Sequence, residues 1–311
     1  MHDAAHTPSD LNVALTQHAA RWADELRISE ALVSELSRLY LPIAQDLLRR
    51  RAQKAAGPLF VGINGAQGSG KSTMFALLMR MFEDVFHVRC AGLSIDDLYL
   101  TKAERQHLGA TVHPLLATRG VPGTHDLPLA QRTLTALGET GEGQVAVPSF
   151  DKSIDDRQPE EAWPRFSMPC DLVILEGWCV GARPQEPHEL AAPVNALEQE
   201  RDGAGTFRRY VNDCLAAGYQ ELFGRLDALI MLRVPSFECV RTFRIEQEHA
   251  LLRRLQQTNP AATVMSDDEV TAFVAYFERL TRAMLQEIPA RADALVTVEA
   301  DHRVSKVEIR R

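Results

Sequence analysis

The stretch Gly65-Ala66-Gln67-Gly68-Ser69-Gly70-Lys71-Ser72 decides the fold of this 311-residue chain. It fits the pattern G-x-x-x-x-G-K-[ST], in which glycines let successive backbone N–H groups turn toward one anion without Cβ clashes. An apolar run, Leu59 to Ile63, precedes it, and a helix-forming run, Ser72 to Phe82, follows it. This order predicts a buried strand, a phosphate-binding loop (P-loop) and a helix whose N-terminus adds partial positive charge.

The composition of the loop predicts that it binds ATP together with Mg²⁺. We expect Lys71 to reach the β- and γ-phosphates and the Ser72 hydroxyl to be a Mg²⁺ ligand. The residues expected to contact the nucleotide are Gly65, Ala66, Gln67, Gly68, Ser69, Gly70, Lys71, Ser72 and Thr73. The sequence has neither a second loop of this kind nor an N-K-x-D element, the usual reader of guanine. These absences favour a transferase for a small molecule over a GTPase, another ATPase or a regulator.

Four further apolar runs predict the rest of the sheet. They are Val88 to Ile95, Leu172 to Leu175, Ala228 to Leu232 and Leu295 to Val298. Because helical stretches separate them, the pattern predicts an α/β fold with a doubly wound parallel sheet.

The flanking segments predict how the chain is organised around this sheet. Residues 1–57 read as a helical N-terminal extension that Pro42 divides or kinks, and residues 58–311 read as the P-loop domain. Turn residues and charges mark about 109–169 as long functional loops, and residues 198–205 as a surface loop.

Composition excludes several classes of protein. With 34 Lys and Arg against 42 Asp and Glu, the net charge of −8 argues against a nucleic-acid partner. No apolar run approaches the roughly 18 residues of a membrane span, and the N-terminus lacks the features of a signal peptide. The five cysteines form no C-x-x-C pair, so neither a disulfide framework nor a zinc site is indicated. We therefore expect a cytoplasmic protein with no membrane partner.

Two acidic segments follow predicted strands, at the sheet edge where open parallel sheets bind ligands. In Ser94-Ile95-Asp96-Asp97-Leu98-Tyr99, Asp96 can accept the proton of a hydroxyl whose oxygen attacks the γ-phosphorus. The alternative for either aspartate is a helix cap, which we favour for Asp97. Glu176 ends another strand, and we expect it to support Mg²⁺ directly or through water, with a structural hydrogen bond as the alternative.

With these residues in view, the chain resembles the P-loop small-molecule kinases that include uridine kinase, phosphoribulokinase and pantothenate kinase. It is most similar to the D-glycerate 3-kinase group, over about residues 59–280. The residues that carry the resemblance are the P-loop, Ser94 to Leu100, His113 to Leu116, Arg119-Gly120-Val121-Pro122-Gly123-Thr124-His125-Asp126, Phe150-Asp151-Lys152-Ser153 with Arg157, Glu176-Gly177-Trp178, Val211-Asn212 through Tyr219, Arg244 through Glu248, and Met265-Ser266-Asp267. The resemblance implies ATP- and Mg²⁺-dependent phosphorylation of D-glycerate to 3-phospho-D-glycerate, with Asp96 as base. It also implies a doubly wound parallel sheet with a mobile lid, which we assign to helices at about 236–285.

A small anion such as glycerate needs a fixed cation for its carboxylate. Lys152 is a reasonable partner because only five of the 34 basic residues are lysines, and Arg119 and Arg157 compete with it. A solvated surface charge is the alternative for each. His125 and Asp126 could hold substrate hydroxyls, or they could begin a helix.

Arg241 and Arg244 lie three residues apart in the expected lid, so they should share one helix face. They could close over the phosphates and, with Lys71 and Asp96, complete the catalytic set. A plain ion-paired helix remains the alternative for the two arginines.

The favoured function is therefore an ATP-dependent kinase for a small hydroxy acid, as a monomer or a homodimer. A kinase for another small alcohol, such as a nucleoside, pantothenate or a sugar, is the nearest alternative. A nucleotide-dependent regulatory protein is the alternative from a different class, and the candidate base and long substrate loops favour the enzyme.

Overall fold

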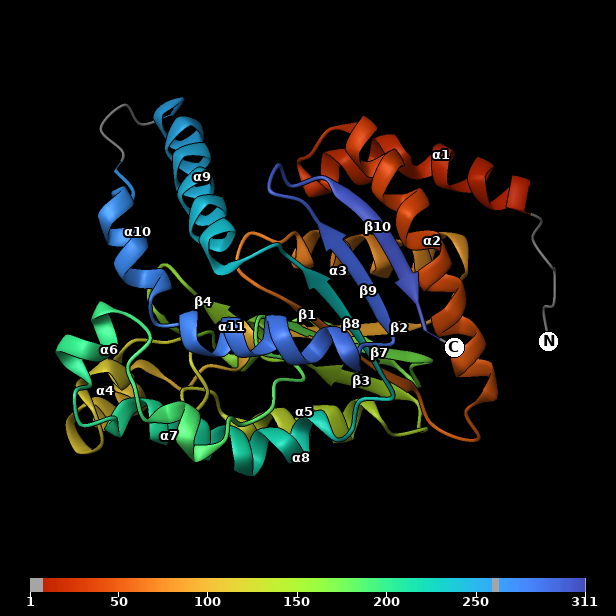
Figure 1. Ribbon diagram of the computed structural model, residues 1–311. Coiled ribbons are helices and arrows are strands. Elements are labelled where there is room, and N and C mark those ends of the chain that lie inside the picture. The colour runs from red at the N-terminus through yellow and green to blue at the C-terminus, as the bar shows by residue number, and fades with distance from the viewer. Residues whose placement is uncertain (1–7, 259–262, 311) are drawn as a thin grey trace.

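The computed structural model describes residues 8–258 and 263–310 (Figure 1). Within this part of the chain, one six-stranded sheet has the order β10-β9-β8-β1-β7-β2. Its strands are β1 Leu59–Gly65, β2 Cys90–Ser94, β7 Leu172–Gly177, β8 Ala228–Arg233, β9 Ala294–Val298 and β10 Val304–Ile309. All neighbours pair in parallel except β9 and β10, which are antiparallel. The predicted parallel α/β sheet is confirmed, and the antiparallel edge strand β10 is an addition to it.

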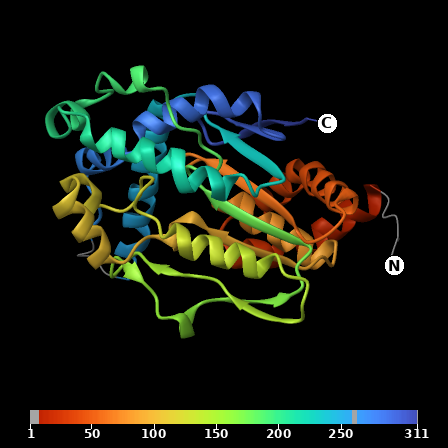
Figure 2. The same ribbon diagram turned by 90° about the horizontal axis from the view of Figure 1, so that it is seen from below.

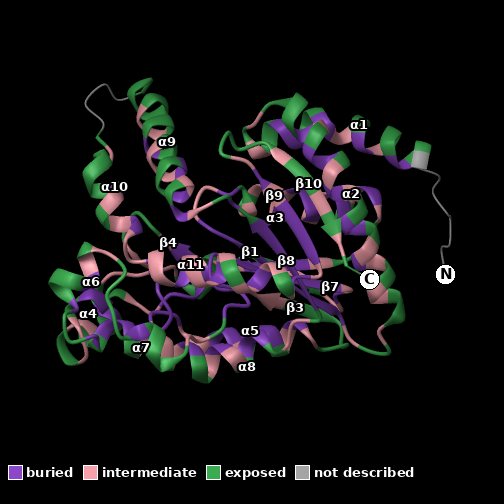
Figure 3. Cartoon of the chain, viewed as in Figure 1, coloured by how far each residue is buried: buried purple, intermediate pink, exposed green. Residues whose placement is uncertain are grey.

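Helices cover both faces of the sheet (Figure 1). On one face lie α1 Pro8–Leu26, α2 Glu30–Gln53 and α3 Lys71–Arg80, and on the other lie α5 Leu127–Leu137, α8 Gln220–Phe223 and α11 Glu278–Glu287. The strands alternate between the two cores: in β1, Val61 and Ile63 face α1–α3, whereas Phe60 faces α5. Because both faces are covered, the central strands β1 and β7 are buried along their length (Figure 3) and read as nearly continuous apolar runs.

The break between the first two helices is not where we expected it. Pro42 lies inside α2, and the chain instead turns between Leu26 and Glu30. Arg27 takes a left-handed backbone conformation with φ of 55°, and the Ser29 side chain accepts a hydrogen bond from the Leu32 N–H to cap α2. The turn at Arg27 and the capping hydroxyl of Ser29 therefore set the boundary between α1 and α2. Helix α2 continues through Pro42 because burial of its apolar face stabilises it.

The segment expected as a long loop between α5 and β7 contains two small two-stranded antiparallel sheets, of which the second is a hairpin. Strand β3 Gly143–Ala146 pairs with β6 Arg165–Met168, and β4 Phe150–Asp151 pairs with β5 Asp156–Arg157. Figure 2 shows this segment running along the outside of α5. The β4–β5 hairpin brings Lys152 and its neighbours toward the carboxyl end of the sheet.

The prediction of a surface loop at residues 198–205 is only partly correct. Residues 202–205 form a turn, but residues 198–201 belong to helix α6, Ala196–Arg201, and Glu198 and Asp202 are buried. Glu198 is held by the distant Arg279 at 2.6 Å, and Asp202 is held by the nearby Arg208 at 3.1 Å. The burial of Glu198 could not be predicted from its polar neighbours, because its partner lies 81 residues along the chain.

The remaining helices gather beside the carboxyl end of the sheet (Figure 1). They are α4 Lys102–Thr111, α7 Thr206–Cys214, α9 Phe237–Gln256 and α10 Asp267–Val274. Helices α9 and α10 form a projecting pair with largely exposed outer faces (Figure 3), and residues 259–262 of the expected lid lie outside the described residues. Within the described ranges, none of the helices is both long and apolar enough to cross a membrane.

Candidate active site

A cavity of about 480 Å³ opens where β1, β2 and β7 end. Its walls come from the P-loop, the segment after β2, the β4–β5 hairpin, the end of β7 and one side of α9. The lining residues are Gln67, Gly68, Lys71, Ser72, Ser94, Asp96, Tyr99, Arg119, Lys152, Glu176, Trp178, Arg244, Gln247, Glu248, Leu251, Arg254, Phe273 and Phe277. The cavity therefore joins the phosphate-binding motif to the two acidic segments that the sequence singled out.

The P-loop has the geometry that its glycines predict. Gly68 and Gly70 take left-handed backbone conformations with φ of +78° and +87°, and Gly70 leads directly into α3. A Cβ on Gly65 would lie 2.5 Å from the Ser69 Oγ. The turn needs glycine at these positions, and it directs the N-terminus of α3 toward the cavity, where it can bind an anion.

Helix α9 packs directly on this loop. A Cβ on Gly68 would lie 2.5 Å from the Phe243 Cβ. The Phe243 ring stacks on His302 at a centroid distance of 3.9 Å, and the His302 ring also contacts Glu246 Oε2 at 2.7 Å. The base of α9 is therefore held between the P-loop and the β9–β10 turn.

Asp96 lies beside the P-loop with both carboxylate oxygens bound. The Tyr99 hydroxyl donates to Oδ1 at 2.9 Å, and the Lys152 ammonium donates to Oδ2 at 2.7 Å. Burial alone would raise the pKa of Asp96, but the charges of Lys152 and Lys71 and these two hydrogen bonds outweigh it and lower the pKa to about 2. Asp96 is therefore an ionised carboxylate that can accept a proton once Oδ2 is released.

Asp97 has the structural role that we favoured, although its partner is not a helix. Its Oδ1 accepts a hydrogen bond from the Phe150 backbone N–H at 3.0 Å, and burial raises the pKa of its carboxyl. This bond attaches the β4–β5 hairpin to the segment that carries Asp96.

Ser72 and Glu176 lie together, as the prediction of a shared metal site requires. The Ser72 hydroxyl is 3.4 Å from Glu176 Oε1, and Glu176 Oε2 is buried without a hydrogen-bond partner among the described residues. An orphaned buried carboxylate oxygen beside a hydroxyl fits a divalent cation or one of its water ligands. The described residues contain no group of three or more His, Cys, Asp or Glu side chains that could hold a metal ion. These two residues would therefore hold Mg²⁺ together with phosphate oxygens of the nucleotide.

The structure separates the five expected substrate residues into two groups. Arg119 and Lys152 line the cavity, whereas His125, Asp126 and Arg157 lie outside it. Arg119 belongs to the same motif as His125 and Asp126, and Lys152 belongs to the same hairpin as Arg157. Only Arg119 and Lys152 reach the cavity, and the other three side chains do not.

Each of these three side chains supports the segment that carries the base. His125 is buried, stacks on Tyr99 and bonds the Tyr219 hydroxyl at 2.6 Å, and burial lowers its pKa to about 4. Asp126 caps α5 by accepting from the Leu129 N–H, so the helix start that we left open for this stretch is observed. The Arg157 guanidinium donates to Asp126 and to the Tyr99 carbonyl, both at 2.9 Å.

The two lid arginines do not line the same cavity. Arg244 faces the site and pairs with the buried Glu248, whereas Arg241 is exposed and lines a separate cavity between α6, α9 and α10. Three residues along a helix still rotate a side chain by about 60°, which is enough to separate them here.

Sequence reasoning missed three other residues that α9 contributes, Gln247, Leu251 and Arg254. With the predicted Arg244 they recur at spacings of three and four and face the cavity as one stripe. The helical period was visible in the sequence, but which stripe faces the P-loop depends on the Phe243–Gly68 contact.

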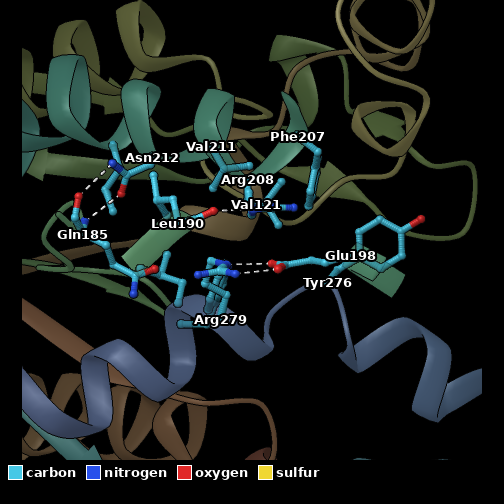
Figure 4. A pocket seen from close by; sticks show the side chains of 13 residues that line it. Val121, Gln185, Leu190, Glu198, Phe207, Arg208, Val211, Asn212, Tyr276 and Arg279 are labelled. Atoms are coloured by element: carbon cyan, nitrogen blue, oxygen red, sulfur yellow. Dashed lines mark hydrogen bonds and ion pairs between the residues drawn. The ribbon is translucent and has the colours of Figure 1, made fainter. Parts of the chain in front are cut away.

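Trp178 also lines a second, smaller cavity of about 30 Å³ (Figure 4). Its polar side chains are already paired: Arg279 with Glu198, and Asn212 with the backbone N–H and carbonyl of Gln185. The cavity has room for about one water molecule, so we assign it no ligand.

Comparison with known proteins places the chain among kinases. No family model matches it. The uncharacterized kinase mug58 of Schizosaccharomyces pombe is 32% identical over 241 residues, which cover 74% of this chain and 82% of that protein. The chloroplastic D-glycerate 3-kinase of Arabidopsis thaliana is 30% identical over 284 residues, which cover 86% of this chain and 58% of that protein. The structure of D-glycerate 3-kinase from Cryptococcus neoformans var. grubii superposes with a TM-score of 0.73 and 24% identity, covering 88% of this chain and 99% of that one. This last similarity bears on the fold alone.

Proposed function

This chain belongs to a family of P-loop kinases and is an ATP-dependent phosphotransferase; from that premise we propose that it is a member of the D-glycerate 3-kinase group, with D-glycerate as its acceptor and 3-phospho-D-glycerate as its product. The name of the Arabidopsis relative supports this acceptor. The charge of the cavity supports it independently. Among the described residues that line it, the cations Lys71, Arg119, Lys152, Arg244 and Arg254 outnumber the carboxylates Asp96, Glu176 and Glu248.

The observation that carries the proposal is the ionised Asp96 beside the P-loop. In the proposed reaction the 3-hydroxyl oxygen of D-glycerate forms a bond to the γ-phosphorus, and its proton passes to Asp96 Oδ2. The bond between the γ-phosphorus and the bridging oxygen breaks, and ADP leaves with that electron pair. A carboxylate with a low pKa suffices because the transition state is loose and the hydroxyl loses its proton late.

The other residues act by position and charge. Lys71 lies where it can neutralise the β- and γ-phosphates, and Arg244 and Arg254 on α9 lie where they can neutralise charge on the transferred group. A Mg²⁺ ion held by Ser72 and Glu176 would supply further neutralisation of phosphate oxygens when bound.

The test is ATP turnover with a panel of acceptors: D-glycerate, L-glycerate, glycerol, uridine and pantothenate. ADP release is measured by a coupled assay and the product is identified by ³¹P NMR. We expect turnover with D-glycerate and a phosphomonoester on its 3-oxygen. Turnover of uridine or pantothenate without D-glycerate would refute the acceptor while leaving the kinase assignment in place.

A further inference from the structure

Three basic side chains compete for the acceptor carboxylate, and the structure gives each a different set of contacts. We infer that Arg119 binds the carboxylate of the acceptor and that Lys152 is instead the counter-ion of the base Asp96. This inference rests on the proposed function, since it assumes an acceptor that carries a carboxylate.

Lys152 is already committed to the base. Its Nζ lies 2.7 Å from Asp96 Oδ2, the oxygen that the acceptor proton must reach, while Tyr99 holds the other oxygen. The Lys152 side chain is 58% exposed and sits on the tip of the β4–β5 hairpin, so it can swing aside without any change in the core. A mobile ammonium on the reactive oxygen orients the carboxylate and tunes its charge, but it is poorly fixed as a substrate receptor.

Arg119 has the opposite properties. One of its N–H groups pairs with Asp155, its guanidinium lies over the Phe150 ring at 5.6 Å, and it lines the cavity. The adjacent Gly120 is fixed on both sides, because its N–H donates to Thr124 Oγ1 at 3.1 Å and its carbonyl accepts from Trp178 Nε1 at 2.9 Å. The guanidinium is therefore preorganised. Its remaining donors have no hydrogen-bond partner in the part of the chain that the structure describes, so they can form a two-point contact with a carboxylate.

The charges around Asp155 leave a net positive charge for the cavity. Arg105, which is 1% exposed, also pairs with Asp155 at 3.0 Å. Two guanidinium groups thus share one carboxylate, and of the three side chains only Arg119 lines the cavity. The positive charge that Asp155 does not neutralise therefore lies at the cavity wall, on Arg119, where it can pair with the carboxylate of an acceptor.

Arg157 is excluded by its partners. Its guanidinium is bound to Asp126 and to the Tyr99 carbonyl, and it does not line the cavity. D-glycerate carries its carboxylate and its 3-hydroxyl at opposite ends, so the Arg119 fork and the Asp96 carboxylate can engage the same molecule from two walls of one cavity.

The test compares Arg119→Met, Arg119→Lys and Lys152→Met in steady-state kinetics with D-glycerate. Arg119→Met should raise KM about 10- to 100-fold with kcat changed less than about threefold, as expected for the loss of a charged hydrogen-bond pair. Arg119→Lys should raise KM about tenfold, because it keeps the charge and loses the fork. Lys152→Met should lower kcat about tenfold or more and leave KM within about threefold. D-lactate, which keeps the carboxylate but lacks the 3-hydroxyl, should compete with D-glycerate, and its inhibition constant should rise in parallel with KM in the Arg119 variants.

Matched controls are Arg201→Met and Lys102→Met. Both side chains are exposed, and neither has an ion pair within the described part of the chain. Thermal melting and titration with an ATP analogue establish that each variant is folded. If Arg119→Met does not fold, the KM of Arg119→Lys alone tests the role of Arg119. If the KM for D-glycerate rose only in Lys152→Met, or rose equally in the Lys152 and Arg119 variants, the assignment of the carboxylate to Arg119 would be overturned. An absence of D-glycerate turnover in the wild-type protein would instead overturn the proposed function together with it.

Discussion

The contact between the P-loop and α9 can be tested with two glycines that differ in one respect. Gly68 and Gly70 both have left-handed backbones, so alanine strains each of them. A Cβ on Gly68 would lie 2.5 Å from the Phe243 Cβ, whereas a Cβ on Gly70 would meet no atom within 4 Å. Gly70→Ala therefore reports backbone strain alone, and Gly68→Ala reports the same strain plus the clash with α9.

The expected magnitudes follow from these two terms. A left-handed alanine costs about 1–2 kcal/mol, and overpacking against a buried side chain adds about 1–3 kcal/mol. Gly70→Ala should therefore lower the free energy of unfolding by about 1–2 kcal/mol, and Gly68→Ala by about 2–5 kcal/mol. At about 2–4 °C per kcal/mol, the Tm of the Gly68 variant should lie roughly 2–12 °C below that of the Gly70 variant.

Differential scanning calorimetry measures both Tm values, and a double-mutant cycle with Phe243→Ala locates the clash. In the Phe243→Ala background, Gly68→Ala should cost about 1–3 kcal/mol less, because the clashing atoms are gone, whereas the cost of Gly70→Ala should not change. Equal Tm values for the two single variants, or additive effects in the cycle, would refute packing of α9 on the P-loop.

Three further predictions concern single side chains of the site and its support. Asp96→Asn should leave the Kd of an ATP analogue unchanged and lower kcat about 100- to 10,000-fold, and an unchanged kcat in the coupled assay would remove Asp96 from the mechanism. Glu176→Gln should raise the Mg²⁺ concentration for half-maximal activity about 10- to 100-fold, because the orphaned Oε2 is lost, and a wild-type metal dependence would contradict that role. Arg279→Met should destabilise the protein by about 3–5 kcal/mol in urea denaturation, because it leaves the buried Glu198 charge unpaired. Adding Glu198→Gln should recover much of that loss, and no recovery would refute the pairing argument.

The parallel sheet and the P-loop could be predicted because their signals are local. A strand buried on both faces is apolar along its whole length, and the glycines after β1 are required by backbone conformations within a few residues. Asp96 and Glu176 could be predicted as neighbours for a related reason. Asp96 follows β2 and Glu176 lies at the end of β7, and neighbouring parallel strands end at the same edge of the sheet.

What the sequence could not supply depends on partners far along the chain. Glu198 looks like a loop residue until Arg279, 81 residues later, is seen to bury it. His125 and Arg119 belong to one motif, yet only the second reaches the cavity, because the His125 ring is held between Tyr99 and Tyr219. The direction in which a loop side chain points is set by such contacts, and no periodic pattern reveals it.

The antiparallel strand β10 also determines what this edge of the folded sheet presents to other molecules. Parallel β9 would otherwise present unpaired N–H and C=O groups, which can template a strand from another molecule. β10 satisfies those groups and turns outward a row that includes Ser305, Lys306 and Glu308, with the last two paired at 2.8 Å. A hydrated, charged margin is a poor template for intermolecular β-pairing, so this side of the sheet is guarded against aggregation.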